Sequence, residues 1–377
     1  MTRVLRIFHA GVVAEYQQRE ALLRARHGYD VHLACPPVWR EAGARVYVER
    51  TASVPVHVMP VRGSDAPNLF WYHTRELTEL IRRLRPDIVD LHEEPFSLAA
   101  AGALIAMGAA SSAARVCFYT AQNLPKQYPP PFSMIERAVF RRAGAAYPCS
   151  TEAGERLRLR GFGKHLHVLP LGVTMPNHHP RARGPIRVGF VGRLEPYKGP
   201  LIAVHAFADA ARDRNATMEI LGVGPQEPLL RDTVKQLGIA SRVTFRGGVS
   251  QSDALRRIAD LSVLIVPSLT TNRWKEQFGR VAVQAMAAGT VVLAFDSGAL
   301  AEVVGPAGVL VAEGDLRGLS NALRILLDDH PRRVQLGRIA RERAERLFSW
   351  EAVASGMNHM YQGLLNDSRE SQSLGRP

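Results

Sequence analysis

Residues 261–294 read LSVLIVPSLTTNRWKEQFGRVAVQAMAAGTVVLA. Leu261–Val266 is an apolar run of strand length, Val281–Ala288 has helical composition, and Val291–Ala294 is a second apolar run. A strand, a loop, a helix and another strand in this order predict a parallel pair joined by a crossover helix. The loop that starts at Pro267 therefore follows the carboxyl end of a strand, where open α/β sheets bind their ligands.

The same alternation extends from this stretch towards both ends of the chain. It predicts an α/β protein built on parallel sheets. Further strands are predicted at residues 4–8, 30–35, 56–60, 88–92, 115–120, 186–191, 218–221 and 243–245. Further helices are predicted at 15–26, 69–84, 200–211, 229–237, 253–259, 316–327, 331–346 and 350–365.

The length of 377 residues is more than one ordinary domain needs and suits two domains. A break in the pattern at residues 175–185 contains three prolines and indicates a linker. We therefore expect an N-terminal domain at 1–174, a C-terminal domain at 186–349, and a central cleft where the two sheets meet. The polar segment 366–377 is predicted to be a disordered tail.

Composition restricts the class of protein. Lys and Arg number 48 against 35 Asp and Glu, giving a formal net charge of +13, which suggests an anionic partner or a solvated positive surface. Three separated cysteines without metal-ligand spacing fit a reducing cytoplasm better than a disulfide or zinc framework. The start of the chain has no cleavable signal pattern. The uncharged segment 95–114 is rich in Ala and Gly and predicts a buried helix rather than a membrane span.

Two glycine-containing loops directly follow predicted strands of the C-terminal domain. The segment 192–199, GRLEPYKG, carries Arg193 and Lys198. A guanidinium, which can donate two parallel hydrogen bonds, together with a compact ammonium suits a diphosphate. The glycines of this segment, Gly192 among them, let backbone approach a ligand, although a charged surface turn has a similar composition. The second loop contains Gly222 and Gly224 and is weak evidence by itself.

The most specific pattern is Glu276-Gln277-Phe278-Gly279-Arg280, which opens the helix that carries Gln284. A helix N-terminus at this position offers free N–H groups and the positive end of the helix dipole to phosphate. Glu276 could instead be a simple dipole partner, and Gln284 an ordinary helical residue. Neither alternative explains why strand, loop and helix occur in the same domain as Arg193 and Lys198.

These segments resemble the donor-binding motifs of family 4 glycosyltransferases. The resemblance is strong over residues 186–327, where it rests on GRLEPYKG, LGVGP, PSLTTNRWKEQFGRVAVQAMAAGTVVLAF and SGALAEVVG in family order. It is moderate over 115–173, through YTAQN, RRAGAAYPCSTEAGERL and VLPLGV, and weak over the first ninety residues. The resemblance implies the GT-B fold, with two Rossmann-like domains, and a retaining, hexosyltransferase-like activity. It also implies that helix 350–365 crosses back onto the N-terminal, acceptor-binding domain.

The family assigns roles to matching positions. It implies that Arg193 and Lys198 bind the donor diphosphate without an obligatory metal, and that Glu276 binds hydroxyls of the donor sugar. Further donor-binding positions implied by the resemblance are Gly192, Gly222, Gly224, Arg246, Gly247, Phe278, Gly279, Arg280 and Gln284. Acceptor-side positions implied by it are Gly11, Gln122, Asn123 and Lys126.

Two positions depart from the family pattern. Gln284 stands where relatives usually carry a second Glu for the ribose hydroxyls, and an amide has one acceptor oxygen where a carboxylate has two. Gln122 stands where many relatives have a His near the transferred sugar, and Gln cannot titrate. His92, at the end of another predicted strand, is the substitute candidate for a catalytic role; a hydrogen-bonded structural role is equally open.

The expected partners are a nucleotide-sugar donor and a saccharide, lipid-linked or small-molecule acceptor, in the synthesis of a cell-envelope polysaccharide, glycolipid or related glycoconjugate. A cytoplasmic protein that touches the anionic inner face of a membrane is a further expectation, without specific nucleic-acid binding. Two alternatives stay open. One is a basic module that binds membrane or nucleic acid, and the other is a GT-B-fold sugar-nucleotide epimerase or phosphorylase.

Overall fold

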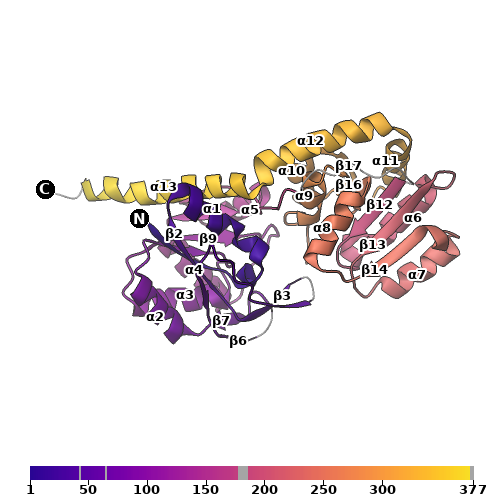
Figure 1. The fold of residues 1–377 in the computed structure, drawn as a ribbon. Coiled ribbons are helices and arrows are strands. Elements are labelled where there is room, and N and C mark those ends of the chain that lie inside the picture. The colour runs from indigo at the N-terminus through magenta and orange to yellow at the C-terminus, as the bar shows by residue number, and fades with distance from the viewer. Residues whose placement is uncertain (42–43, 64–65, 177–185, 374–377) are drawn as a thin grey trace. The chain divides into compact units, whose positions relative to one another are not determined.

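The chain forms two compact α/β units in the computed structural model, which describes residues 1–41, 44–63, 66–176 and 186–373 (Figure 1). The N-terminal unit consists of Met1–Gly172 and the segment from Trp350 onward. The C-terminal unit consists of Val173–Ser349. Most of the predicted linker, from residue 177 to 185, lies outside the described residues.

The N-terminal unit is built on seven parallel strands in the order β11-β10-β9-β8-β1-β2-β5. Their bounds are β1 Arg3–Ile7, β2 Asp30–Cys35, β5 Val56–Val58, β8 Ile88–Leu91, β9 Arg115–Thr120, β10 Ala145–Pro148 and β11 His165–Leu166. The chain adds strands on one side of β1 first and then, from β8 on, on the other side. The strand order therefore reverses between β1 and β8, the position at which open α/β sheets bind ligands.

Six α-helices belong to the described part of this unit. They are α1 Gln18–His27, α2 Thr74–Leu84, α3 Leu98–Ala109, α4 Phe132–Arg142, α5 Thr151–Leu159 and α13 Trp350–Ser373. Helix α1 is preceded by two short 3-10 turns, η1 at His9–Val12 and η2 at Ala14–Gln17, where a single helix from residue 15 was predicted.

The helix predicted at 69–84 begins only at Thr74, which corrects the sequence analysis. Residues Phe70–Tyr72 form strand β7, which pairs antiparallel with β6 at Val61–Gly63. Three consecutive aromatic residues favour extended backbone, and their burial alternates as in a strand, with Phe70 at 1%, Trp71 at 40% and Tyr72 at 0% exposure. A second antiparallel hairpin, β3 Val38–Glu41 with β4 Ala44–Tyr47, was not predicted.

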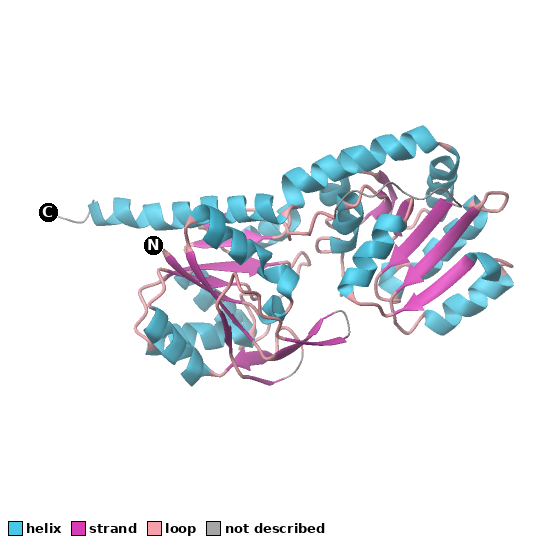
Figure 2. Cartoon of the chain, in the orientation of Figure 1, coloured by secondary structure: helices cyan, strands magenta, loops and turns pink. Residues whose placement is uncertain are grey.

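The C-terminal unit contains a six-stranded parallel sheet in the order β14-β13-β12-β15-β16-β17, with helices on both faces (Figure 2). The strands are β12 Ile186–Val191, β13 Ala216–Leu221, β14 Val243–Gly247, β15 Val263–Val266, β16 Val291–Asp296 and β17 Val309–Ala312. The α-helices are α6 Pro200–Ala210, α7 Glu227–Gln236, α8 Gln251–Asp260, α9 Arg280–Ala287, α10 Leu300–Val304, α11 Leu316–Asp328 and α12 His330–Phe348. Here the strand order reverses between β12 and β15.

The last helix is longer than predicted. Helix α13 continues to Ser373, through residues 366–373 that were expected to be a disordered tail. The sequence NDSRESQS has neither Pro nor Gly, so nothing in it ends a helix at residue 365. Residues 374–377 of the predicted tail lie outside the described residues.

The uncharged segment 95–114 contains α3, which packs against β7 and α2. A methyl group added at Gly102 would lie 3.7 Å from Trp71 Cβ and 3.8 Å from the Tyr72 carbonyl oxygen, which shows how closely the two backbones approach. Within the described ranges, no helix combines the length and the apolar character that crossing a bilayer requires.

We predict that Gly172→Ala destabilises the N-terminal unit. A methyl group at Gly172 would lie 2.2 Å from the nearest ring atom of Trp350, whose side chain is only 6% exposed and which opens α13. Overpacking of this kind costs about 1–3 kcal/mol, measured as the free energy of urea-induced unfolding. Gly163→Ala is the matched control, since no atom lies within 4 Å of its added methyl group. Equal stability of the two variants would contradict the contact.

Candidate functional site

The loops that follow β12, β13 and β14 are hydrogen-bonded to one another at the carboxyl edge of the C-terminal sheet. The Gly192 N–H donates to the Leu221 carbonyl at 2.9 Å, and the Leu194 N–H donates to the Val223 carbonyl at 3.0 Å. The Gly222 N–H donates to the Gly247 carbonyl at 2.8 Å. The predicted positions Gly192, Gly222 and Gly247 therefore lie side by side.

Glycine is required where these loops touch. Gly222 has φ +138°, and a methyl group there would lie 1.8 Å from the Gly192 carbonyl oxygen. A methyl group at Gly224 would lie 2.5 Å from the Leu194 carbonyl oxygen. At Gly199, with φ +69°, it would lie 2.2 Å from the Pro267 carbonyl oxygen, which brings the loop after β15 against the loop after β12.

Lys198 and Glu276, 78 residues apart in sequence, meet at this edge. Lys198 Nζ lies 2.7 Å from Glu276 Oε2, and Ser268 Oγ donates to the same oxygen at 2.9 Å. The Glu276 side chain is 9% exposed and that of Lys198 is 21% exposed. The ammonium also lies 4.4 Å from the centre of the Trp274 ring. The two separately predicted patterns therefore meet at the same edge of the sheet.

Arg193 supplies a second cation to the same loop. Its side chain is exposed, and its guanidinium carbon lies 5.5 Å from the centre of the Tyr197 ring. Among the described residues, no carboxylate lies within ion-pair distance of Arg193. Its charge is therefore available to a ligand, whereas that of Lys198 is balanced by Glu276.

Helix α9 begins at this edge without an acidic or side-chain cap. Its N-cap is Gly279, with φ +81°, and its first turn holds no acidic residue. No described group accepts a hydrogen bond from the Phe278 or Gly279 N–H. The Glu276 carbonyl accepts from the Ala299 N–H at 3.0 Å, which fixes the loop in front of the helix. Free N–H groups at a helix N-terminus suit an anion.

Three other predicted donor-binding residues, Arg246, Arg280 and Gln284, differ in what surrounds them. Arg246 lies against Glu219, with Nη2 to Oε1 at 2.9 Å, so its charge is paired. Burial raises the pKa of Glu219, but hydrogen bonds from Arg246 and Arg257 outweigh it and hold the pKa below its usual value. Arg280 and Gln284 are half-buried and four residues apart on α9, and therefore lie on one face of the helix.

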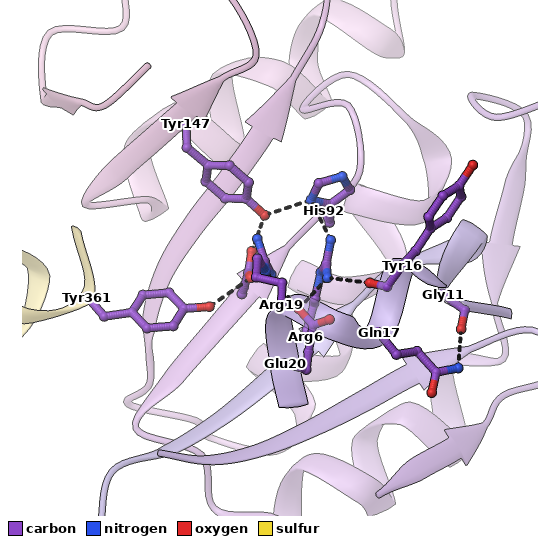
Figure 3. A network of polar contacts seen from close by, with 10 residues as sticks. Arg6, Gly11, Tyr16, Gln17, Arg19, Glu20, His92, Tyr147 and Tyr361 are labelled. Carbon is purple, nitrogen blue, oxygen red and sulfur yellow. Dashed lines mark hydrogen bonds and ion pairs between the residues drawn. The ribbon is translucent and has the colours of Figure 1, made fainter. Parts of the chain in front are cut away.

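The N-terminal unit contains a buried polar network next to the strands where its order reverses (Figure 3). Asp90 accepts hydrogen bonds from Arg19, from the Tyr147 hydroxyl, and from the Tyr361 hydroxyl at 2.8 Å. Glu20 accepts from Arg6, and from Arg19 Nε at 2.7 Å. Two arginines thus balance two carboxylates in surroundings that water hardly reaches.

The hydroxyls of this network stay protonated. Burial, reinforced by the charge of Asp90, raises the pKa of Tyr147 and Tyr361 well above the usual value. Both tyrosines therefore act as O–H donors to Asp90 at physiological pH. Tyr361 belongs to α13, so the C-terminal helix is part of the polar core of the N-terminal unit.

His92 takes part in the same network. Its Nδ1 lies 3.1 Å from Arg6 Nη2 and 3.0 Å from the Tyr147 hydroxyl, and its ring stacks on Tyr119 with centroids 4.1 Å apart. The residue is 7% exposed. These contacts fit the structural alternative left open for His92, and its catalytic role stays a prediction.

The four acceptor-side predictions lie on two loops. The Gly11 carbonyl, after β1, accepts from Gln17 Nε2 at 2.9 Å. After β9, Gln122 Oε1 accepts from the Leu124 N–H at 3.0 Å, and Asn123 is 1% exposed with Nδ2 3.4 Å from Glu152. Lys126 has an exposed side chain, and its carbonyl accepts from Arg160. Both loops follow carboxyl ends of strands.

Sequence reasoning missed three residues at this edge. His9, just after β1, has Nδ1 2.6 Å from Glu93 Oε2. Glu94 accepts from the Thr120 hydroxyl at 2.5 Å and from the Ala121 N–H at 2.8 Å, and burial raises its pKa to about 7. The available signal was two adjacent acidic residues behind an apolar strand, together with a His behind the first strand.

Comparison with known families covers most of the chain. Residues 174–343 match the family described as Glycosyl transferases group 1, and residues 19–175 match Glycosyltransferase Family 4. Among curated proteins, a D-inositol 3-phosphate glycosyltransferase of Corynebacterium glutamicum is 38% identical over 186 residues, covering 46% of this chain and 42% of that protein. An MMP alpha-(1->4)-mannosyltransferase of Mycolicibacterium hassiacum is 34% identical over 209 residues, covering 53% and 48%. The chain thus spans about half the length of these relatives.

Solved structures match over nearly the whole chain. A sucrose-phosphate synthase of Thermosynechococcus elongatus has a TM-score of 0.72 at 20% identity and covers 97% of this chain and 100% of its own. HepE of Anabaena, solved with UDP and glucose, has a TM-score of 0.73 at 17% identity and covers 96% and 100%. The predicted GT-B fold is confirmed by these likenesses together with the two parallel sheets.

We predict that His92→Ala lowers stability. Removal of the imidazole leaves the Arg6 guanidinium with one partner fewer in a buried position, where Arg6 Nε already has none among the described residues. The expected loss is about 1–3 kcal/mol in the free energy of urea-induced unfolding. His205→Ala, exposed on α6, is the control and should change stability by less than about 0.5 kcal/mol. Unchanged stability in His92→Ala would count against the structural role.

Proposed function

We propose that this chain, which belongs to the group 1 and family 4 glycosyltransferases, transfers a sugar from a nucleoside diphosphate sugar to an acceptor hydroxyl with retention of anomeric configuration. The observation that carries the proposal is the contact of Lys198 with Glu276, beside Arg193 and the uncapped N-terminus of α9. All of these groups lie on loops at the carboxyl edge of the C-terminal sheet.

Cleavage of the bond between sugar and diphosphate places negative charge on the leaving group. Preorganised cations and N–H groups directed at that charge stabilise the transition state. Arg193 and Lys198 are the cations that we assign to the diphosphate, and the Phe278 and Gly279 N–H groups add the helix-end dipole. Because these groups can neutralise the diphosphate, we propose that no metal ion is obligatory.

Glu276 has two tasks in this proposal. Without donor it balances the charge of Lys198, and with donor bound it accepts hydrogen bonds from hydroxyls of the sugar while Lys198 turns to the phosphate. The backbone of Arg246 and Gly247 borders the base, and Gln284 holds the ribose. Since Glu276 is engaged by Lys198 and Ser268, we assign it to binding and favour front-face attack by the acceptor hydroxyl over a covalent intermediate.

The similar proteins support a proposal for the substrate class. The names of two relatives mention inositol phosphate and a mannosyl group, and the HepE structure was solved with UDP and glucose. We propose a hexose donor and a polyhydroxylated acceptor, which is a saccharide, lipid-linked or small molecule used in glycolipid or polysaccharide synthesis. A cytoplasmic site of action, with or without contact with an anionic membrane surface, belongs to the same proposal.

The donor site is tested by binding and turnover together. UDP-, GDP- and ADP-linked glucose and mannose are screened by thermal shift, and one of them should raise apparent stability by about 2.7 kcal/mol at a concentration 100 times its Kd. Arg193→Ala and Lys198→Ala should each lower donor turnover about 100-fold, because one charge-stabilising donor is lost. Lys235→Ala, exposed on α7, is the control. Near-normal turnover in both site variants, or binding of none of the donors, would refute the proposal.

We expect Gln284→Glu to tighten donor binding. A carboxylate accepts from both ribose hydroxyls, and hydrogen bonds to a charged acceptor are stronger than those to an amide. Calorimetric titration should give a Kd lower by about 10-fold, equivalent to one additional charge-assisted hydrogen bond. Gln236→Glu on α7, an exposed position with the same change of charge, should leave the Kd unchanged. A weaker or unchanged Kd for Gln284→Glu would contradict the assigned ribose contact.

A further inference from the structure

Trp274 lies in the loop between β15 and α9, just before Glu276, and the proposed function gives it no role. Its ring lies against the ammonium of Lys198, with Nζ 4.4 Å from the ring centre. Lys198 Nζ also lies 2.7 Å from Glu276 Oε2. The ammonium is therefore held by two groups of different chemistry, a carboxylate and an aromatic ring.

Hydrogen bonds fix the backbone from which the Trp274 side chain extends. The Thr271 N–H donates to the Trp274 carbonyl at 2.8 Å, and the Trp274 N–H donates to Thr271 Oγ1 at 2.9 Å, which closes a tight turn. Ahead of this turn, the Leu269 N–H donates to the Tyr197 carbonyl at 2.8 Å. The loop that carries Trp274 is therefore tied to the segment that carries Lys198.

The ring of Trp274 also packs against a second aromatic side chain. The ring centroids of Trp274 and Tyr197 lie 4.4 Å apart, and the two ring planes meet at 34°. Both residues are half-buried. Tyr197 in turn has the guanidinium carbon of Arg193 5.5 Å from its ring centre. Two aromatic rings, packed on each other, therefore contact the two cations that we assign to the diphosphate.

A carboxylate and an aromatic ring hold an ammonium in different ways. The carboxylate accepts a hydrogen bond from an N–H group, and in the proposed function a phosphate oxygen takes its place. The ring attracts the cation through the negative charge of its face, which accepts no conventional hydrogen bond. An ammonium has three N–H groups, and a ring on one side leaves those on the other side available. Lys198 can therefore exchange Glu276 for phosphate without leaving Trp274.

We propose that Trp274 is a positioning residue, which keeps the ammonium of Lys198 at the donor diphosphate while the hydrogen-bond acceptor of that ammonium changes. The inference rests on the proposed function, in which Lys198 binds the diphosphate. The lysine side chain has a flexible stem of four carbons. A ring that restricts this stem beforehand lowers the entropy lost when the ammonium binds phosphate. Trp274 thus acts through Lys198 and not by contact with the donor.

The contact is tested with inorganic pyrophosphate, which has the diphosphate but neither base nor sugar. Trp274→Leu keeps an apolar side chain without an aromatic face, and should raise the Kd in calorimetric titration about 3- to 30-fold, the range of a cation–π contact. Trp274→Phe keeps a weaker aromatic face and should recover part of this loss. Trp71→Leu is the matched control, at a side chain of the N-terminal unit that is 40% exposed, and should leave the Kd unchanged. Equal Kd values for Trp274→Leu and Trp274→Phe would overturn the proposal, because apolar packing alone would then explain the effect.

A double-mutant cycle tests whether Trp274 acts through Lys198. In the wild-type background, Trp274→Leu should also lower turnover of the donor identified in the thermal-shift screen about 3- to 30-fold. In the Lys198→Ala background, the same change should alter neither this turnover nor the Kd of pyrophosphate, because the ammonium that the ring holds is gone. Losses of equal size in the two backgrounds are additive, indicate a general effect on the fold, and overturn the positioning role.

The results separate this inference from the proposed function. If Lys198→Ala leaves pyrophosphate binding and donor turnover near their wild-type values, Lys198 does not bind the diphosphate, and the proposed function is refuted together with the role of Trp274. If Lys198→Ala weakens both while Trp274→Leu weakens neither, only the role of Trp274 is overturned. Far-UV circular dichroism shows whether each variant is folded. Should Trp274→Leu fail to fold, Trp274→Phe enters the same cycle with an expected loss of about 2- to 10-fold.

Discussion

The ion pair between Lys198 and Glu276 is the contact on which the candidate donor site depends. Its partners follow β12 and β15, the neighbouring strands between which the order of the C-terminal sheet reverses. Because Glu276 is nearly buried, its charge needs a partner whenever no donor is present. Lys198 provides it, so that the cation is held in position beforehand. In the proposed function a diphosphate then replaces one anion by another beside the same ammonium, while Ser268 and the sugar hydroxyls donate to Glu276.

The N-terminal sheet repeats this arrangement with different chemistry. His9 and Glu93 follow β1 and β8, where an imidazole takes the place of the ammonium. Beneath them, Arg6, Arg19, Glu20 and Asp90 form a balanced network from the same two strands and α1. A buried network in which every charge has a partner of opposite sign restrains its side chains, and a residue placed on it is held accurately.

Five of the six strands of the C-terminal sheet were predicted, because short apolar runs such as 186–191 and 263–266 end at a turn or loop signal; the edge strand β17, Val309–Ala312, was not predicted. The same regularity identified Lys198 and Glu276, although only the fold could bring them to 2.7 Å. The helix predicted at 69–84 was wrong at its start, because Phe70–Tyr72 pairs with β6, and pairing is a non-local property. His9 was missed for a related reason. Its character depends on Glu93, which is 84 residues away in sequence.

The net charge of +13 has a structural explanation that the composition alone could not reveal. Many arginines donate to carbonyls in the last turns of helices, where the dipole is negative. Helices α3, α6, α9, α10 and α11 receive such bonds from Arg82, Arg242, Arg341, Arg343 and Arg333. An arginine that donates to helix-end carbonyls has a structural role. The surplus of positive charge therefore does not by itself require a nucleic acid or a membrane, which weakens the binding-module alternative relative to the transferase.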